Sequence, residues 1–158
     1  MQRIPLSKGQ HATVDDQDFD LLNQWRWYCR HGYAVRNIYL GGGRKKPRYR
    51  TVAMHRLITD APAGLDVDHK NRDPLDNRRR NLRVCSRSQN STNSRKRSGS
   101  SRFKGVCWLA GRKAWIAQIC KDGRRYELIT TKDEEEAALY YDIAAQLLHG
   151  PFAHINHV

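Results

Sequence analysis

Residues 64–93 read GLDVDHKNRDPLDNRRRNLRVCSRSQNSTN, and this stretch decides how the rest of the chain is interpreted. Two short runs, Leu65–Asp68 and Leu82–Cys85, predict a pair of strands joined by a polar loop. Ser86 is a favourable N-cap for a helix that extends to about Arg95. We therefore expect a unit of strand, loop, strand and helix.

This unit brings together side chains that suit phosphodiester hydrolysis. His69 is a candidate general base, because the pKa of an unperturbed imidazole is roughly 6.5. Asp68 and Asn90 offer hard oxygen ligands, which suit Mg²⁺ or Mn²⁺ and not zinc. Asn81 is expected to hold the loop and to orient the His69 ring. Taken singly, each residue also fits an ordinary surface turn, and only their combination favours a catalytic site.

Three stretches, VDHKN, DNRRRNLR and SQNSTN, resemble the HNH endonuclease family in its phage and homing branch, as does the preceding MHRLI. The resemblance implies a ββα-metal finger in which His69 is the general base and Asn81 supports the loop. It also implies that one divalent cation is held by Asp68 and Asn90, with Asn93 as the rival ligand to Asn90. By the same resemblance the products carry 5′-phosphate and 3′-hydroxyl ends. A monomer is then expected to nick one strand, whereas a homodimer cuts both.

Zinc is not expected in this chain. The four cysteines, at positions 29, 85, 107 and 120, contain no Cys-x-x-Cys pair. The four-cysteine zinc site of other HNH branches is therefore not matched.

The charge of the chain indicates a polyanionic partner, and we expect double-stranded DNA. The 158 residues include 29 Lys and Arg against 16 Asp and Glu, a net charge of +13. Most of this excess lies in the first hundred residues. No apolar run approaches the roughly 20 residues of a membrane span, and the polar start of the chain does not resemble a secretory signal. We therefore expect no membrane partner and a cytoplasmic location in a bacterial or phage-infected host.

Basic residues in and after the central motif are expected to contact the DNA backbone. The alternative for the run Asn77–Arg80 is a solvated face. The predicted contacts are Arg78, Arg79, Arg80, Arg83, Arg87, Arg95, Lys96 and Arg97.

The flanking regions suggest the remaining domains. Residues 1–53 read as a small β-rich region of short strands and turns. Within it, Gly41–Arg50 has five basic residues and is either a mobile basic loop or the solvated tip of a hairpin. The nuclease finger spans 54–97, and the small, basic stretch 98–102 has linker composition.

Residues 103–158 predict a three-stranded antiparallel sheet packed on one helix. The strand-like runs are Phe103–Leu109, Ala114–Cys120 and Arg124–Thr130, and Asp122–Gly123 is a hairpin turn signal. A capping box formed by Thr131 and Glu134 starts the helix, whose apolar stripe is Ala137, Tyr141, Ala144, Ala145 and Leu148. The uncovered face of such a sheet can enter a major groove.

This region, over residues 102–156, resembles the Apetala-2-like DNA-binding domain of plant ethylene-response factors. The stretches that carry the resemblance are FKGV, WIAQI and EEAA through YDIAA. Cys107, Cys120 and Glu127 depart from the family's contact positions, so its target sequence cannot be carried over. Tyr141 has core packing as its alternative role. The DNA contacts that the resemblance implies are Lys104, Trp108, Gln118, Arg125 and Tyr141.

Together these observations predict an α+β protein that is a metal-dependent DNA endonuclease of the homing or phage HNH type. A non-catalytic, sequence-specific DNA-binding regulator with a structural finger is the first alternative. An RNA-binding protein is the second. All four expected roles in the finger are filled, which favours the enzyme.

Overall fold

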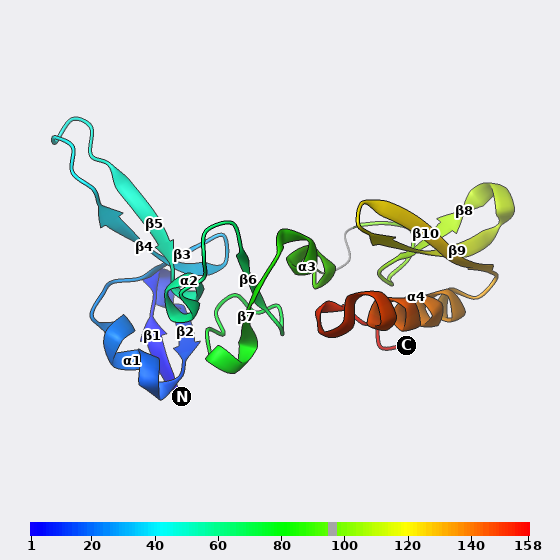
Figure 1. Cartoon of the computed structure of the whole chain (residues 1–158), viewed down its shortest axis with the longest axis horizontal. Helices are drawn as coiled ribbons and strands as arrows, with labels where there is room; N and C mark the ends of the chain where they lie inside the picture. The colour runs from blue at the N-terminus through cyan, green and yellow to red at the C-terminus, as the bar shows by residue number, and fades with distance from the viewer. Residues whose placement is uncertain (95–97) are drawn as a thin grey trace. The chain divides into compact units, whose positions relative to one another are not determined.

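The computed structural model describes residues 1–94 and 98–158 (Figure 1). Three predicted DNA contacts, Arg95, Lys96 and Arg97, lie outside the described residues. The chain forms two compact units, Met1–Ser86 and Arg87–Val158, each with its own apolar core. The division lies after the second strand of the predicted finger, whereas sequence composition favours 98–102 as the boundary.

The first unit is built from antiparallel strands and two helices. β1 pairs with β2, β6 pairs with β7, and the remaining strands form a sheet in the order β3-β4-β5. Short 3-10 turns occupy Ser7–Gly9 and Arg79–Asn81. The strands are β1 (Gln2–Pro5), β2 (His11–Val14), β3 (Tyr28–Arg30), β4 (Tyr33–Tyr39), β5 (Tyr49–Ala53), β6 (Asp66–His69) and β7 (Leu82–Cys85), and the helices are α1 (Asp16–Asn23) and α2 (Met54–Thr59).

The N-terminal region contains a helix, α1, that the sequence analysis does not predict. Asp16 and Asp18 lie in its first turn, where a carboxylate interacts favourably with the helix N-terminus. Phe19 and Leu22, three residues apart, both pack into the core. The expectation of only strands and turns is therefore wrong here. The acidic start and the helical spacing were the available signal.

The core of the first unit joins elements that are distant in sequence. Ile4 in β1, Leu22 in α1 and Met54 in α2 are each at most 1% exposed. α2 ends at Asp60, whose left-handed φ of 46° turns the chain toward β6. Arg56 donates hydrogen bonds to three backbone carbonyls of this turn, at 2.7–2.9 Å, so the entry into β6 is fixed.

The second unit is an antiparallel sheet in the order β10-β9-β8 with α4 packed on one face. Its three strands coincide closely with the three β-like runs of the sequence. Ala137, Ala145 and Leu148 of the predicted apolar stripe contact the core, as expected. The elements are α3 (Arg87–Thr92), β8 (Val106–Leu109), β9 (Ala114–Lys121), β10 (Arg124–Thr131) and α4 (Glu134–His149), with 3-10 turns at Ala110–Arg112 and Gly150–Phe152.

The N-cap of α4 differs from the predicted capping box. Asp133, and not Thr131, is the cap, and its carboxylate accepts hydrogen bonds from the backbone N–H groups of Glu135 and Glu136. An aspartate at this position satisfies two otherwise unpaired donors of the first turn. Across residues 1–94 and 98–158, no helix combines the length and the hydropathy that crossing a bilayer requires.

Tyr141 belongs to the core of the second unit. It is 5% exposed, and burial raises the pKa of its hydroxyl to about 12. Its ring lies directly against the backbone of Gly105, which has a φ of +78°. The predicted DNA contact of Tyr141 is therefore wrong, because the helix turns this side chain toward the sheet.

The contact between Gly105 and Tyr141 makes a stability prediction. Gly105→Ala would place a Cβ inside the volume of the Tyr141 ring and impose a positive φ on alanine. We expect a loss of roughly 2–4 kcal/mol in the free energy of unfolding, measured by urea denaturation. Gly111→Ala is the matched control, because its Cβ would have no neighbour within 4 Å. A Gly105→Ala protein as stable as this control would contradict the packing.

Candidate functional site

The β6–β7 pair places the two central residues of the VDHKN motif. Asp68 lies opposite Arg83 and His69 lies opposite Leu82 in the antiparallel register. Both motif side chains are buried, at 6% exposed for Asp68 and 5% for His69. Successive strand residues point to opposite faces, so the carboxylate and the imidazole leave the strand on different sides.

Asp68 forms a buried ion pair with Arg83. Its Oδ2 accepts hydrogen bonds from Nε of Arg83 at 2.8 Å and from Nη2 at 2.5 Å. The guanidinium therefore pairs the Asp68 carboxylate in a place where an unpaired charge would be costly. Arg83, predicted as a contact to the DNA backbone, has a role inside the protein.

His69 lies among an amide and two aromatic neighbours. Its Nε2 is 3.4 Å from Oδ1 of Asn77. Its ring centroid is 5.2 Å from that of His55, in an edge-to-face arrangement, and 5.9 Å from that of Tyr33. Burial lowers the pKa of His69 below its ordinary value, and the contact with Asn77 opposes this effect. The imidazole is thus held neutral near pH 7.

The loop between β6 and β7 is held by Asn81. Its Oδ1 accepts from the backbone N–H of Asn71 at 3.0 Å, and its Nδ2 donates to the carbonyl of Asp76 at 2.7 Å. This is the loop support that the sequence predicted. The amide that lies beside the His69 ring is that of Asn77, which is fully buried and not part of a solvated face. The orienting role of Asn81 stays a prediction.

Asp76 ties the same loop together. Its carboxylate accepts hydrogen bonds from Nε and Nη2 of Arg78, both at 2.6 Å, and from Nδ2 of Asn71 at 2.8 Å. The hydrogen bonds from Arg78 hold the pKa of Asp76 below its usual range. β2 adds a backbone connection, because the carbonyl of Thr13 accepts from the N–H of Asn77 at 2.7 Å.

Two arginines of the run at residues 78–80 form ion pairs within the protein. Arg79 pairs with Asp18 of α1 through hydrogen bonds of 2.8 and 2.7 Å, and Arg78 pairs with Asp76. The structure therefore gives Arg78 and Arg79 a role in holding the loop. Arg80 and Arg87 are exposed, as a backbone contact requires.

His55 is a neighbour of the site to which the sequence analysis assigned no role. It lies on α2, and within the part of the chain that the structure describes its buried Nδ1 has no hydrogen-bond partner. Burial, and then the nearby His69 and Arg56, lower the pKa of His55 to about 4. The signal was available, because His55 is part of the MHRLI stretch.

The donors for a cation are of the expected kind but are divided between the units. The Asp68 carboxylate is a hard ligand in the first unit, and Asn90 lies on α3 in the second. Asn93, the rival ligand, is in the second unit as well and is 5% exposed. Among residues 1–94 and 98–158, no group of three or more His, Cys, Asp or Glu is placed to hold a metal ion. The Asp68 carboxylate is of the hard, oxygen-bearing kind that Mg²⁺ prefers, and Mg²⁺ needs only one or two such ligands because it keeps several waters.

In the second unit, two of the predicted DNA contacts remain on the surface. Trp108 is 40% exposed with its ring against Trp115, and Arg125 is exposed on β10. Gln118 is half-buried. Lys104 has a contact within the protein, because its Nζ donates to the carbonyls of Thr92, the last residue of α3, and of Ser94.

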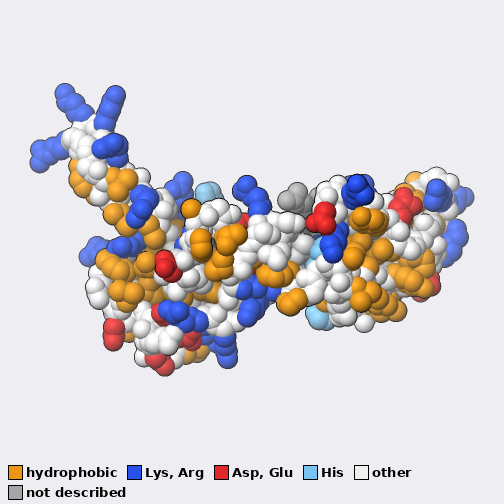
Figure 2. All heavy atoms as spheres, viewed as in Figure 1, with side chains coloured by type: hydrophobic (Ala, Val, Ile, Leu, Met, Phe, Trp, Pro, Cys, Tyr) orange, Lys and Arg blue, Asp and Glu red, His pale blue; other side chains and the backbone are white. Residues whose placement is uncertain are grey.

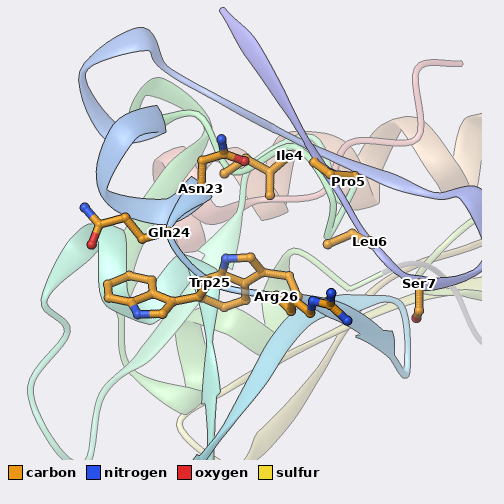
Figure 3. Close-up of a pocket in the computed structure, with 9 residues that line it drawn as sticks. Ile4, Pro5, Leu6, Ser7, Asn23, Gln24, Trp25 and Arg26 are labelled. Atoms are coloured by element: carbon orange, nitrogen blue, oxygen red, sulfur yellow. The ribbon is translucent and has the colours of Figure 1, made fainter.

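A pocket of about 470 Å³ lies elsewhere in the first unit (Figure 3). Residues 4–7 and 23–27 line it, and none of the predicted site residues does. The guanidinium of Arg36 stacks over the Trp25 ring at 3.7 Å, and the indole N–H of Trp27 donates to the carbonyl of Leu22. These contacts account for the two tryptophans as structural residues.

Comparisons with known proteins bear on this site. Residues 52–92 match the family model described as HNH endonuclease. The chain is similar to an uncharacterized HNH endonuclease of Acanthamoeba polyphaga mimivirus, with 31% identity over 152 residues, 96% of this chain and 77% of that protein. It is also similar to Protein 3.8 of Escherichia phage T7, with 27% identity over 110 residues, 69% of this chain and 90% of that protein. The family match ends before the C-terminal sheet, so the resemblance of that sheet to Apetala-2-like domains rests on sequence alone.

His55 predicts how stability depends on pH. Its pKa is about 4 in the folded chain against 6.5 when unperturbed, so the unfolded chain binds more protons between these values. Stability is therefore fully present above pH 6.5 and is lost as the pH falls toward 4. We expect a decrease on the order of 1–2 kcal/mol between pH 7 and pH 5, measured by urea unfolding. His55→Phe keeps the ring contacts and should lose part of this decrease, while an unchanged pH dependence would contradict the assignment.

Proposed function

Because this chain belongs to the HNH endonuclease family, and is thus a nuclease, we propose that it hydrolyses phosphodiester bonds of duplex DNA with His69 as general base and one divalent cation. The observation that supports the proposal is the buried imidazole of His69, with the amide of Asn77 at its Nε2, directly after the ion-paired Asp68 in β6. The family assignment favours the enzyme over the non-catalytic regulator and over an RNA-binding protein.

The surroundings of His69 support its role as a base. Nδ2 of Asn77 donates to the carbonyl of Pro74 at 3.4 Å, so the Oδ1 end of this amide faces the imidazole. An oxygen acceptor at Nε2 favours the tautomer that carries its proton there. The lone pair then lies on Nδ1, which takes the proton of the attacking water. The lowered pKa keeps this nitrogen unprotonated near neutral pH.

Asp68 would hold the cation in the first unit, and the ligand role of Asn90 stays a prediction from the sequence. When bound, the cation supplies positive charge against the oxygens of the scissile phosphate and the departing 3′ oxygen. Arg83 holds Oδ2 of the Asp68 carboxylate, and carboxylates that bind metal ions are commonly held by such hydrogen bonds. The products would carry 5′-phosphate and 3′-hydroxyl ends, and one such site per chain would nick a single strand.

The second unit is proposed to position the enzyme on DNA. Its resemblance to Apetala-2-like domains, with Trp108 and Arg125 exposed, supports contact through the sheet. The named relatives come from a mimivirus and a phage, which supports a role in the cytoplasm of an infected host cell. We keep both statements as proposals for this chain.

Plasmid nicking tests the proposed chemistry. The full chain should nick supercoiled plasmid with Mg²⁺ or Mn²⁺ and not with EDTA. His69→Ala should lower the rate by roughly 10²–10⁴-fold, because a general base contributes about that much, and should leave DNA binding intact. His11→Ala, which changes an exposed histidine of β2, is the control and should nick at the wild-type rate. Nicking that persists in EDTA would contradict the proposed dependence on a cation. A His69→Ala protein that nicks at the wild-type rate would contradict the role of His69 as general base.

The two loop asparagines should separate positioning from folding. Asn77→Ala removes the acceptor beside His69, so we expect kcat to fall by about tenfold or more with little change in KM for DNA. Asn81→Ala removes two hydrogen bonds to the loop backbone and should mainly lower the free energy of unfolding, by about 1–3 kcal/mol. Nicking rates and urea unfolding of both variants give the comparison. The reverse pattern would show that Asn81 is the residue that orients the imidazole.

A further inference from the structure

The β4–β5 hairpin carries a group of cations that the proposed site does not use. The basic arm is defined here as β4, β5 and the connecting residues 40–48, and Figure 1 shows it extending from the body of the first unit. Five basic residues occupy its outer part, and no Asp or Glu occurs between residues 32 and 59. In Figure 2 the tip is covered by Lys and Arg side chains. These cations are Arg44, Lys45, Lys46, Arg48 and Arg50.

The cations of the arm are free, unlike the arginines of the central loop. All five are exposed. In the part of the chain that the structure describes, none of them forms an ion pair, whereas Arg78, Arg79 and Arg83 each hold a carboxylate. Five like charges close together without a counter-charge repel one another, and a polyanion relieves that repulsion.

The tip of the arm is a turn defined by backbone hydrogen bonds and by a glycine. The backbone N–H of Leu40 donates to the carbonyl of Arg48, and that of Arg48 donates to the carbonyl of Gly41, both at 2.8 Å. Gly42 has a φ of +97°, and a Cβ there would collide with the carbonyl oxygen of Lys46. The turn therefore depends on glycine, and it presents its cations from a hydrogen-bonded backbone.

One face of the arm is polar and uncovered. Asn37 pairs with Thr51, and Tyr39 pairs with Tyr49, so these four side chains share a face. Tyr39 and Tyr49 are 56% and 57% exposed, with ring centroids 5.5 Å apart. Within the arm the Tyr39 hydroxyl donates to the carbonyl of Gly42, and the Thr51 hydroxyl donates to Oδ1 of Asn37 at 2.9 Å. The Asn37 Nδ2 group and the Tyr49 hydroxyl are exposed and able to hydrogen-bond to base edges.

We propose that the basic arm is a DNA-binding β-ribbon that enters the major groove of duplex DNA, with its tip cations against the flanking phosphates. The major groove of B-form DNA admits a two-stranded ribbon, whereas that of A-form RNA is too narrow to be read by side chains. The shape of the arm therefore favours DNA over RNA. This inference rests on the proposed function for the identity of the nucleic acid, but its test measures binding and not cleavage.

The test compares two matched double variants in the full chain carrying His69→Ala, so that DNA is bound but not cut. Lys45→Gln with Lys46→Gln neutralises two tip cations, and Arg3→Gln with Lys8→Gln neutralises two exposed cations of the first unit outside the arm. Affinity for a short duplex is measured by fluorescence anisotropy over a range of salt concentrations. Each lost phosphate contact lowers the salt slope by about 0.9, so the arm variant should lose nearly two units and the control none.

Several outcomes would overturn the proposal. Equal slopes for the arm variant and the parent protein would remove the arm from the interface. An equal loss in the control variant would show only a net-charge effect. A greater loss of affinity for a structured RNA than for the duplex would assign the arm to RNA. The nicking assay is independent: an inactive wild-type protein with the expected slope change would overturn the nuclease mechanism and leave the arm in place.

Discussion

The proposed chemistry depends on a polar loop held in one conformation by hydrogen bonds. Between β6 and β7 the chain has few apolar side chains to bury, so packing alone does not fix its course. The Asp76 carboxylate and the Asn81 amide fix it instead, by bonding to Arg78, Asn71 and the loop backbone. Because Asn77 is part of the same loop, the acceptor beside His69 is placed by this network. Arg79 and β2 then connect the loop to the N-terminal elements.

The sequence predicted those parts of the fold in which local pattern and tertiary structure agree. The bounds of β7, the three C-terminal strands and the apolar stripe of α4 follow directly from hydrophobic periodicity. The helix α1 is not predicted, because its eight residues carry the helical spacing of Phe19 and Leu22 over only about two turns. The N-cap of α4 was misplaced for a similar reason, since Thr131 and Asp133 both lie near the start and only the backbone geometry selects Asp133.

The candidate site shows a sharper limit of sequence reasoning. Asp68, His69 and Asn81 are predicted as site residues from residue type and spacing, which is how a motif encodes chemistry. Their partners were not identified, because a side chain such as Arg83 or Asn77 reads as a solvated polar residue until its neighbours in space are known. The sequence also does not predict which positive charges are available to a partner. Arginines of the central loop are paired within the protein, while the cations of the hairpin are not. Composition counts both groups alike, and only the fold separates them.

The hydrogen bonds from Lys104 to the end of α3 have a consequence for how this enzyme could evolve or be engineered. The segment that matches the family ends at residue 92, yet the carbonyls of Thr92 and Ser94 accept hydrogen bonds from a lysine beyond it. At its other end, the segment shares its core with Ile4 and Leu22. The matched segment is thus not an autonomous module. Grafting it alone onto another scaffold would leave apolar surface bare on one side and a helix terminus untethered on the other, so recombination of such genes should favour exchange of longer pieces.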